Sequence, residues 1–152
     1  MEKTWTLLYG KGHARVTTEE DMEVQVLESR DLPHSADQKE ILRKALAHPI
    51  GSRSLGELTK DVRKILIITN DNTRPLPSAL TLPEIIGSFY YPADHYEITI
   101  LIANGLHRPM TLQEMEEQYG EEICRKYRIV NHNAKDPQEN VFLGTMTSGN
   151  EL

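Results

Sequence analysis

Two polar segments of the chain carry residue types that can bind an anion and move a proton. Residues 70–75 contain Asp71 and Arg74, and residues 104–109 contain His107. An arginine can hold a carboxylate through two parallel hydrogen bonds, and a histidine titrates near neutral pH and can serve as a general base. Asp71 can orient His107 or accept a hydrogen bond from a substrate or ribose hydroxyl. These residue types predict a site for a small anionic ligand, without specifying a reaction.

Each segment taken alone also has a plainer interpretation. Asp71 is a common residue type in a turn after a strand, and Arg74 and Arg108 can be surface charges beside prolines. His107 can be a loop histidine bonded to the backbone. We favour a site only because two such segments follow two strands that we expect to be neighbours.

The elements that position these segments have the pattern of a parallel α/β sheet. Continuous apolar runs predict strands buried on both faces, and each polar segment stands between such a strand and a helix. Ligands of open α/β sheets bind outside the carboxyl ends of the strands, and a right-handed crossover makes consecutive strands neighbours. The predicted elements are strands at 65–68, 96–103, 128–131 and 141–143, a helix over 82–90 with Thr81 as cap and Pro83 in its first turn, and a helix opened by a capping box at 111–114 and ended near Gly120.

Short strands at 5–9, 13–17 and 23–27 are predicted to form an antiparallel piece near the N-terminus. A helix over 37–47 follows, capped by Ser35 or Asp37, and a second short helix begins at Ser54. The predicted fold class is therefore α/β, with a parallel Rossmann-like sheet core, helices on its faces and a small N-terminal antiparallel β piece.

Composition excludes several classes of protein. The 152 residues carry a net charge of −6, which disfavours a nucleic acid or an anionic membrane as partner. Cys124 is the only cysteine, so an internal disulfide and a cysteine-based metal site are excluded, and a reducing, cytoplasmic setting fits. We find no signal peptide, and the longest apolar run, 100–103, is far shorter than the ~20 residues of a membrane span. No glycine-rich phosphate loop and no histidine pair with metal-ligand spacing is present, so the residues themselves assign neither a metal site nor cofactor-binding residues.

Three short motifs of the sequence are specific enough to compare with a known family. Residues 71–75 read Asp-Asn-Thr-Arg-Pro, and residues 105–108 read Gly-Leu-His-Arg. They resemble the Asp-x-Thr-Arg-Pro and Gly-x-His-Arg motifs of the nickel-dependent lactate racemase family. Residues 48–51 read His-Pro-Ile-Gly and resemble its Asn-Pro-Ile-Gly turn, with histidine in place of asparagine. The resemblance runs over roughly residues 9–149.

The resemblance implies the N-terminal α/β domain of a 2-hydroxy-acid racemase or epimerase. Its implied cofactor is a nickel-pincer nucleotide tethered to a lysine. Hydride leaves substrate C2 for this cofactor, a planar 2-keto intermediate forms, and hydride returns to either face. His107 matches one of two histidines that act as acid and base on the substrate hydroxyl, and Arg74 matches the arginine that binds the substrate carboxylate. Asp71 matches the motif aspartate, to which we assign orientation of the site; Arg108 receives no chemistry.

The same resemblance places the second catalytic histidine, the cofactor-bearing lysine and the nickel-ligating histidine beyond Leu152. We therefore expect residues 1–152 to be the truncated N-terminal domain of a longer protein, with half an active site and with neither cofactor nor turnover of its own. The expected partners are a small 2-hydroxy carboxylate and the missing C-terminal portion. Truncation would leave apolar surface uncovered near 141–143, and a homo-oligomer through that surface is a further expected partner. Two alternatives stay open: a non-catalytic carboxylate-binding or interaction domain, and an unrelated α/β nucleotide-binding module, which the missing phosphate loop disfavours.

Overall fold

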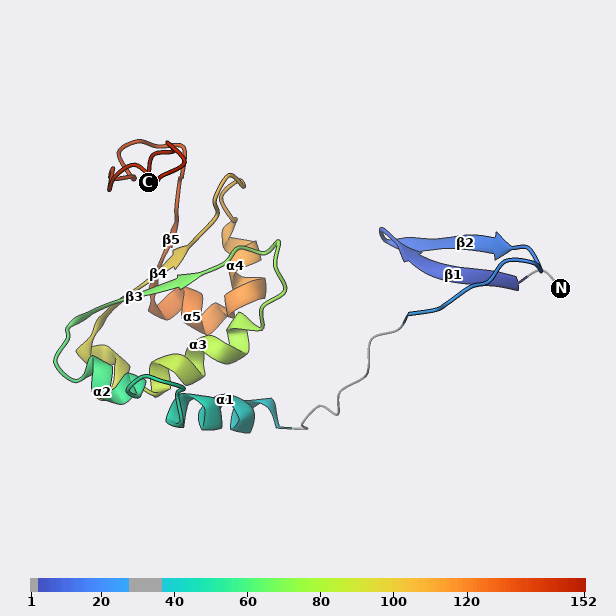
Figure 1. The fold of residues 1–152 in the computed structure, drawn as a ribbon. Coiled ribbons are helices and arrows are strands. Elements are labelled where there is room, and N and C mark those ends of the chain that lie inside the picture. Colours follow the sequence, from blue (N-terminus) through green and yellow to red (C-terminus); the bar gives the residue numbers. More distant parts are fainter. Residues whose placement is uncertain (1–2, 28–36) are drawn as a thin grey trace. The chain divides into compact units, whose positions relative to one another are not determined.

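The computed structural model describes residues 3–27 and 37–152, in a chain that divides into two compact units, Met1–His34 and Ser35–Leu152. Ser35, one of the two predicted helix caps, lies outside the described residues. We describe each unit by itself (Figure 1).

The first unit is built around an antiparallel hairpin. Strand β1 (Lys3–Tyr9) pairs with β2 (Gly12–Thr18), as predicted, and Trp5 lies opposite Val16. The third strand predicted at 23–27 is wrong, because these residues join no backbone ladder. Val24 and Val26 instead line a hollow together with Trp5, and both remain exposed.

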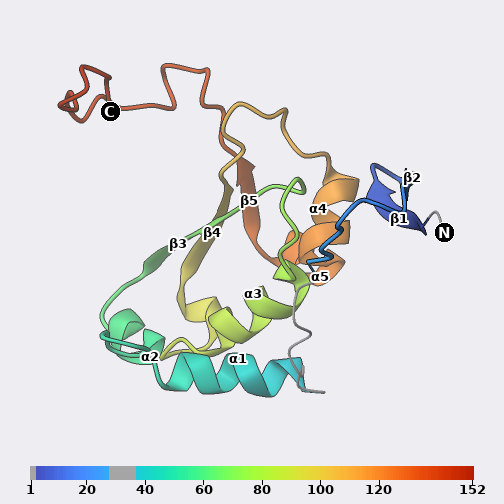
Figure 2. The same cartoon turned by 45° about the vertical axis from the view of Figure 1, so that its right-hand side comes forward.

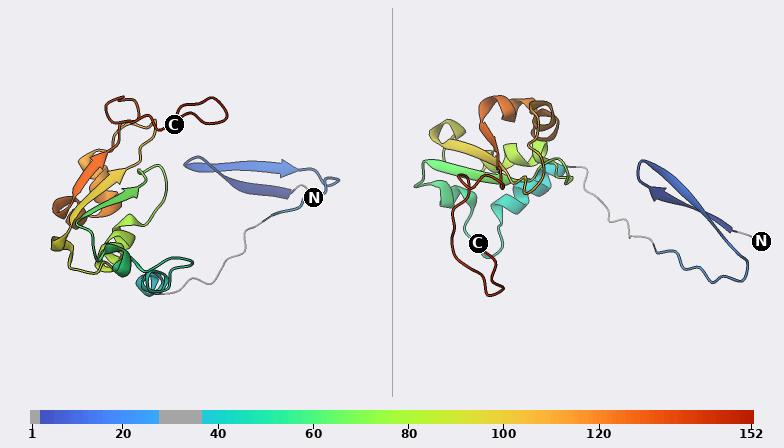
Figure 3. Two further views of the ribbon diagram at one scale, coloured as in Figure 1. Left: turned by 60° about the vertical axis from the view of Figure 1, so that its left-hand side comes forward. Right: turned by 90° about the horizontal axis from the view of Figure 1, so that it is seen from above.

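The second unit contains a parallel three-stranded sheet. Its strands are β3 (Lys64–Thr69), β4 (Glu97–Ile102) and β5 (Arg128–Asn131), in the order β3-β4-β5. Ile67 pairs with Ile100, and Ile100 with Ile129, so all three strands run the same way. Figure 3 shows β4 between its two neighbours. The parallel sheet and the adjacency of β3 and β4 are confirmed.

The helices begin where side-chain caps or prolines place them. Asp37 caps α1 by accepting from the Glu40 N–H at 3.0 Å, and Ser54 and Thr111 open α2 and α4 with capping boxes. These three starts are confirmed. The helical elements are α1 (Gln38–Ala47), α2 (Leu55–Thr59), α3 (Ser78–Gly87), the 3₁₀ turn η1 (Ala93–His95), α4 (Leu112–Tyr119) and α5 (Glu121–Lys126).

Helix α3 begins four residues before its predicted start. Pro77 precedes it in place of a side-chain cap, so Thr81 is not the cap, and Pro83 lies inside the helix rather than in its first turn. A proline there lacks the N–H that would bond the preceding turn. Burial explains why the helix continues through it, because Leu82 and Ile86 on either side are 2% and 5% exposed in the core.

The core lies between the sheet and one layer of helices. Leu82 and Ile86 of α3, Tyr119 of α4 and Ile123 of α5 pack in one cluster with the isoleucines of β4 that alternate onto this face, Ile98, Ile100 and Ile102. Helix α1 packs on α3, on its side away from the sheet (Figures 1 and 2).

Two predictions about apolar segments are corrected. The run at 65–68 was expected to be buried on both faces, but Leu66 and Ile68 are 57% and 65% exposed, since the described helices pack against the opposite face. Residues 141–143 form no strand; Leu143 instead bonds the carbonyl of Leu152 through its backbone N–H at 2.7 Å. The apolar side chains of 141–143 are exposed, as expected. Among the described residues, every helix is too short or too polar to cross a bilayer.

Because the described core lies on one face of the sheet, replacing an isoleucine by alanine should lower the free energy of unfolding by very different amounts on the two faces. Ile100 is fully buried, so Ile100→Ala should lower the free energy of unfolding by about 2–5 kcal/mol through lost burial and a residual cavity. Ile68 lies on the open face of the neighbouring strand, and Ile68→Ala is the matched control, with an expected cost within about 1 kcal/mol. Urea denaturation measures both; equal losses would mean that the open face is covered.

Candidate functional site

The two polar segments meet at the carboxyl ends of β3 and β4. The loop after β3 carries Asp71, the loop after β4 carries His107, and His107 Nδ1 lies 2.6 Å from Asp71 Oδ2. The predicted adjacency of these two side chains is therefore confirmed. It follows from the topology, since adjacent parallel strands deliver their following loops to the same edge of the sheet.

The Asp71 carboxylate is buried and fully engaged. It is 4% exposed, its Oδ1 accepts from the Thr73 hydroxyl at 2.6 Å and the Thr73 N–H at 3.1 Å, and its Oδ2 faces His107. The hydrogen bond from the Thr73 hydroxyl is the largest influence on the pKa of Asp71, which lies below its usual value although burial opposes the shift; His107 lowers it further. Asp71 is thus an ionised acceptor inside the fold.

This environment determines which nitrogen of His107 carries a proton. A carboxylate only accepts hydrogen bonds, so His107 Nδ1 must donate to Asp71. In the neutral ring Nε2 then holds a lone pair. The imidazole side chain is 56% exposed, so a ligand can reach the ring. The pair can act as a proton acceptor backed by a negative charge.

The two motif arginines have different surroundings. The side chain of Arg74 is exposed, and within residues 3–27 and 37–152 it has no hydrogen bond or ion pair. Arg108 is held by Glu114 through two bonds of 2.8 and 2.5 Å. Arg74 is therefore the motif cation that is open to a carboxylate ligand, while Arg108 is already neutralised.

Arg108 has a structural role that was not predicted from the sequence. Its partner Glu114 also accepts from Asn72 Nδ2 at 3.0 Å and from the Thr111 N–H at 2.8 Å. Arg108 is the main reason that the pKa of Glu114 falls to about 2. One carboxylate thus joins the second loop, the start of α4 and the first loop.

Helix α4 fastens the first loop at two further points. Gln118 Nε2 donates to the carbonyl of Asp71 at 3.1 Å, and the Tyr119 hydroxyl donates to the carbonyl of Asn70 at 2.9 Å. Tyr119 is fully buried, and burial raises its pKa to about 12. Sequence reasoning missed these residues, although the i, i+4 spacing of Glu114 and Gln118 places both on one helix face.

An asparagine side chain closes each of the two loops by a hydrogen bond to a backbone carbonyl. Asn70 directly follows β3 and donates from Nδ2 to the carbonyl of Arg74 at 3.1 Å, and Asn104 follows β4 and donates to the carbonyl of Arg108 at 3.4 Å. Each amide spans four residues and folds its loop back on the strand end. Gly105 adopts a φ of +57°, a conformation that glycine takes without strain.

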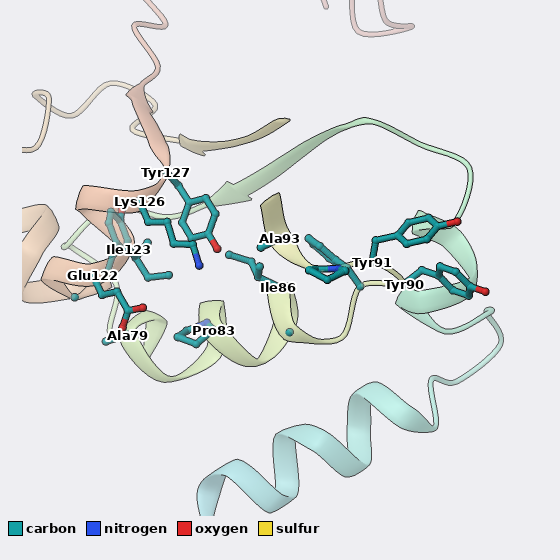
Figure 4. A pocket seen from close by; sticks show the side chains of 15 residues that line it. Ala79, Pro83, Ile86, Tyr90, Tyr91, Ala93, Glu122, Ile123, Lys126 and Tyr127 are labelled. Atoms are coloured by element: carbon teal, nitrogen blue, oxygen red, sulfur yellow. The ribbon is translucent and has the colours of Figure 1, made fainter. Parts of the chain in front are cut away.

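The three predicted site residues do not line the hollow beside α3 and α5. A hollow of about 560 Å³ lies between α3 and α5, where Lys126 and Tyr127 face Pro83 and Ile86 (Figure 4), and its lining includes neither arginine nor histidine of the motifs. Asp71, Arg74 and His107 stand instead on the two loops at the sheet edge. That Arg74 and His107 bind the same ligand stays a prediction.

A metal centre is not formed by the part of the chain that the structure describes, since it holds no group of three or more histidine, cysteine, aspartate or glutamate side chains placed to bind an ion. Cys124 is half-buried, and burial raises the pKa of its thiol. Its side chain packs against the core cluster.

Comparison with known proteins gives consistent matches. Residues 9–152 match the family described as lactate racemase N-terminal domain. The lactate racemase of Thermoanaerobacterium thermosaccharolyticum is 36% identical over 115 residues, and that of Lactiplantibacillus plantarum 38% over 114, covering 76% and 75% of this chain. The chain spans 27% of the length of each.

Two solved structures resemble the fold. The apoprotein of the Thermoanaerobacterium thermosaccharolyticum lactate racemase superposes with a TM-score of 0.84 at 31% identity, over 98% of this chain and 34% of that one. A Thermotoga maritima protein has a TM-score of 0.53 at 23% identity, over 78% of this chain and 27% of that one, and supports the fold alone.

The buried carboxylate predicts a pH-dependent contribution to stability. Because the pKa of Asp71 is lowered on folding, its contribution is fully present above the unfolded pKa and is lost as the pH falls through the folded pKa. Asp71→Asn should lower the free energy of unfolding by about 1–3 kcal/mol at pH 7, and by progressively less below pH ~4. Urea titrations between pH 7 and 3 measure this difference. Asp61→Asn, at an exposed aspartate, is the control. A difference in the free energy of unfolding between wild type and Asp71→Asn that does not change with pH would contradict a lowered pKa for Asp71.

Proposed function

The chain belongs to the family of the lactate racemase N-terminal domain, and on this premise we propose that it handles the substrate in a 2-hydroxy-acid racemase or epimerase. The relatives are named lactate racemases, so a lactate-like 2-hydroxy carboxylate is the proposed substrate. The observation that carries the proposal is the Asp71–His107 pair, whose ring is accessible, together with Arg74. Arg74 lies on the same loop as Asp71, and its side chain has no partner among the described residues.

In this proposal Arg74 binds the substrate carboxylate through its two parallel N–H groups. The substrate hydroxyl then lies at His107, whose Nε2 lone pair accepts the hydroxyl proton as C2 loses hydride and becomes a ketone carbon. The positive charge that forms on the imidazole is stabilised by the ionised Asp71. The same nitrogen returns the proton when hydride comes back to C2.

The hydride acceptor is proposed to be the nickel-pincer nucleotide of the family, since protein side chains do not store hydride. The described residues contain no group of three ligands suited to nickel, so they are not proposed to hold the metal. The second acid–base histidine and the cofactor-bearing lysine are proposed to come from other parts of a complete racemase. That residues 1–152 alone show no turnover stays a prediction, as do a homo-oligomer and a cytoplasmic setting.

A carboxylate-binding domain without catalysis would need the free arginine but not the proton-transfer pair. Carboxylate binding alone gives no reason to bury an ionised aspartate at 4% exposure next to an accessible histidine. It also gives no reason for the two hydrogen bonds by which Thr73 turns that aspartate toward the histidine. This arrangement favours the racemase over the binding domain.

The test uses a complete, cofactor-loaded racemase that carries this sequence as its N-terminal part. Arg74→Lys should mainly raise KM for D- and L-lactate, because an ammonium cannot reproduce the two-bond clamp. His107→Ala should mainly lower kcat, by ~10²–10⁴-fold. Racemisation is followed by chiral chromatography.

Matched controls are Arg125→Lys, on the exposed side of α5, and His95→Ala, which precedes β4 and so lies at the opposite end of the sheet. Both should leave the kinetics unchanged. Wild-type kinetics in His107→Ala would refute the assignment of the acid–base residue.

A further inference from the structure

We infer that Thr73 is a positioning residue, which holds Asp71 so that His107 keeps the one tautomer able to accept the substrate proton. The inference rests on the proposed function, in that it takes His107 as the acid–base residue. The side chain of Thr73 has its hydrogen bond to Asp71 and, among the described residues, none to His107, so we infer that it acts through the aspartate.

The geometry divides the two oxygens of Asp71 between two partners. Thr73 directs both its hydroxyl, at 2.6 Å, and its backbone N–H, at 3.1 Å, to Oδ1, and the other oxygen faces His107 Nδ1 at 2.6 Å. The terminal torsion of an aspartate is broad and would otherwise leave the carboxylate free to turn. Two donors on one oxygen therefore fix the direction of the other.

Solvent reaches the Asp71 carboxylate too little to replace the threonine. Asp71 is 4% exposed, so a donor lost from Oδ1 leaves a charged oxygen poorly solvated. The Thr73 hydroxyl also does most to keep the pKa of this carboxylate low against the opposing effect of burial. Removing the hydroxyl would weaken both the direction and the charge of the group that faces the histidine.

The tautomer of His107 is where this matters for chemistry. A neutral imidazole carries one proton, and an acceptor at Nδ1 keeps it there, which leaves Nε2 as the base. If the carboxylate turns or takes a proton, the tautomer with a proton on Nε2 becomes populated, and that nitrogen can no longer accept one. A threonine is suited to this task because its branched side chain restricts χ1 and so holds the hydroxyl in place.

The test reads the tautomer directly, without substrate or cofactor. The chain of residues 1–152 is labelled with ¹⁵N-histidine, and long-range ¹H–¹⁵N spectra at pH ~8 identify which ring nitrogen of His107 is protonated; the His107→Ala spectrum assigns the signals. In the wild type we expect Nδ1 protonated and Nε2 unprotonated. In Thr73→Val the ratio of the two tautomers should shift toward Nε2–H by about tenfold, while Thr73→Ser should stay near wild type.

The matched control is Thr99→Val, the same chemical change on β4 away from both loops, and it should not move the tautomer. A predominant Nε2–H tautomer in the wild type overturns the inference without any variant. So does an unchanged tautomer in both Thr73→Val and a second variant, Thr73→Ala, or an equal shift in Thr99→Val.

Activity of the complete racemase separates this inference from the proposed function. Thr73→Val should lower kcat about tenfold with KM little changed, and Thr73→Ser should restore it. A tautomer shift with unchanged kcat would support the positioning and count against His107 as the acid–base residue. Loss of turnover in His107→Ala with no tautomer shift in Thr73→Val would overturn only the role of Thr73.

Discussion

A buried carboxylate that must stay charged is the constraint on which this site depends. Asp71 is 4% exposed, and an ion in that position is stable only when donors replace the water it has lost. Thr73 supplies two donors from the same loop, and His107 supplies the third from the loop after the next strand. Satisfying one aspartate thus joins the two motifs and determines how the imidazole is presented.

Helix α4 explains why the two loops stay together. It begins directly after the second loop, yet three of its side chains, those of Glu114, Gln118 and Tyr119, accept from or donate to the first loop. Arg108 completes this arrangement by neutralising Glu114. The two motif arginines are therefore not equivalent: Arg108 is paired with Glu114, while the side chain of Arg74 has no hydrogen bond or ion pair in the described structure.

The sequence predicted the parts of the fold that depend on local patterns and on topology. Ser54 and the capping box at 111–114 located the starts of α2 and α4, and the crossover rule was enough to bring Asp71 to His107. Prediction from the sequence failed where tertiary packing determines the structure. Helix α3 continues through Pro83 because its neighbouring residues are buried, and residues 23–27 alternate apolar and polar side chains without pairing as a strand. The bonds from α4 to the first loop were missed because they depend on where the helix lies, which no local pattern states.

The central claim is that Asp71 and His107 act as one unit on the substrate. A double-mutant cycle on kcat tests it most directly, with Asp71→Asn, His107→Ala and the double variant in a complete, cofactor-loaded racemase. If Asp71 works through His107, the double variant should be no slower than His107→Ala alone. Losses that multiply, so that the double variant falls by the product of the two single effects, would contradict the account.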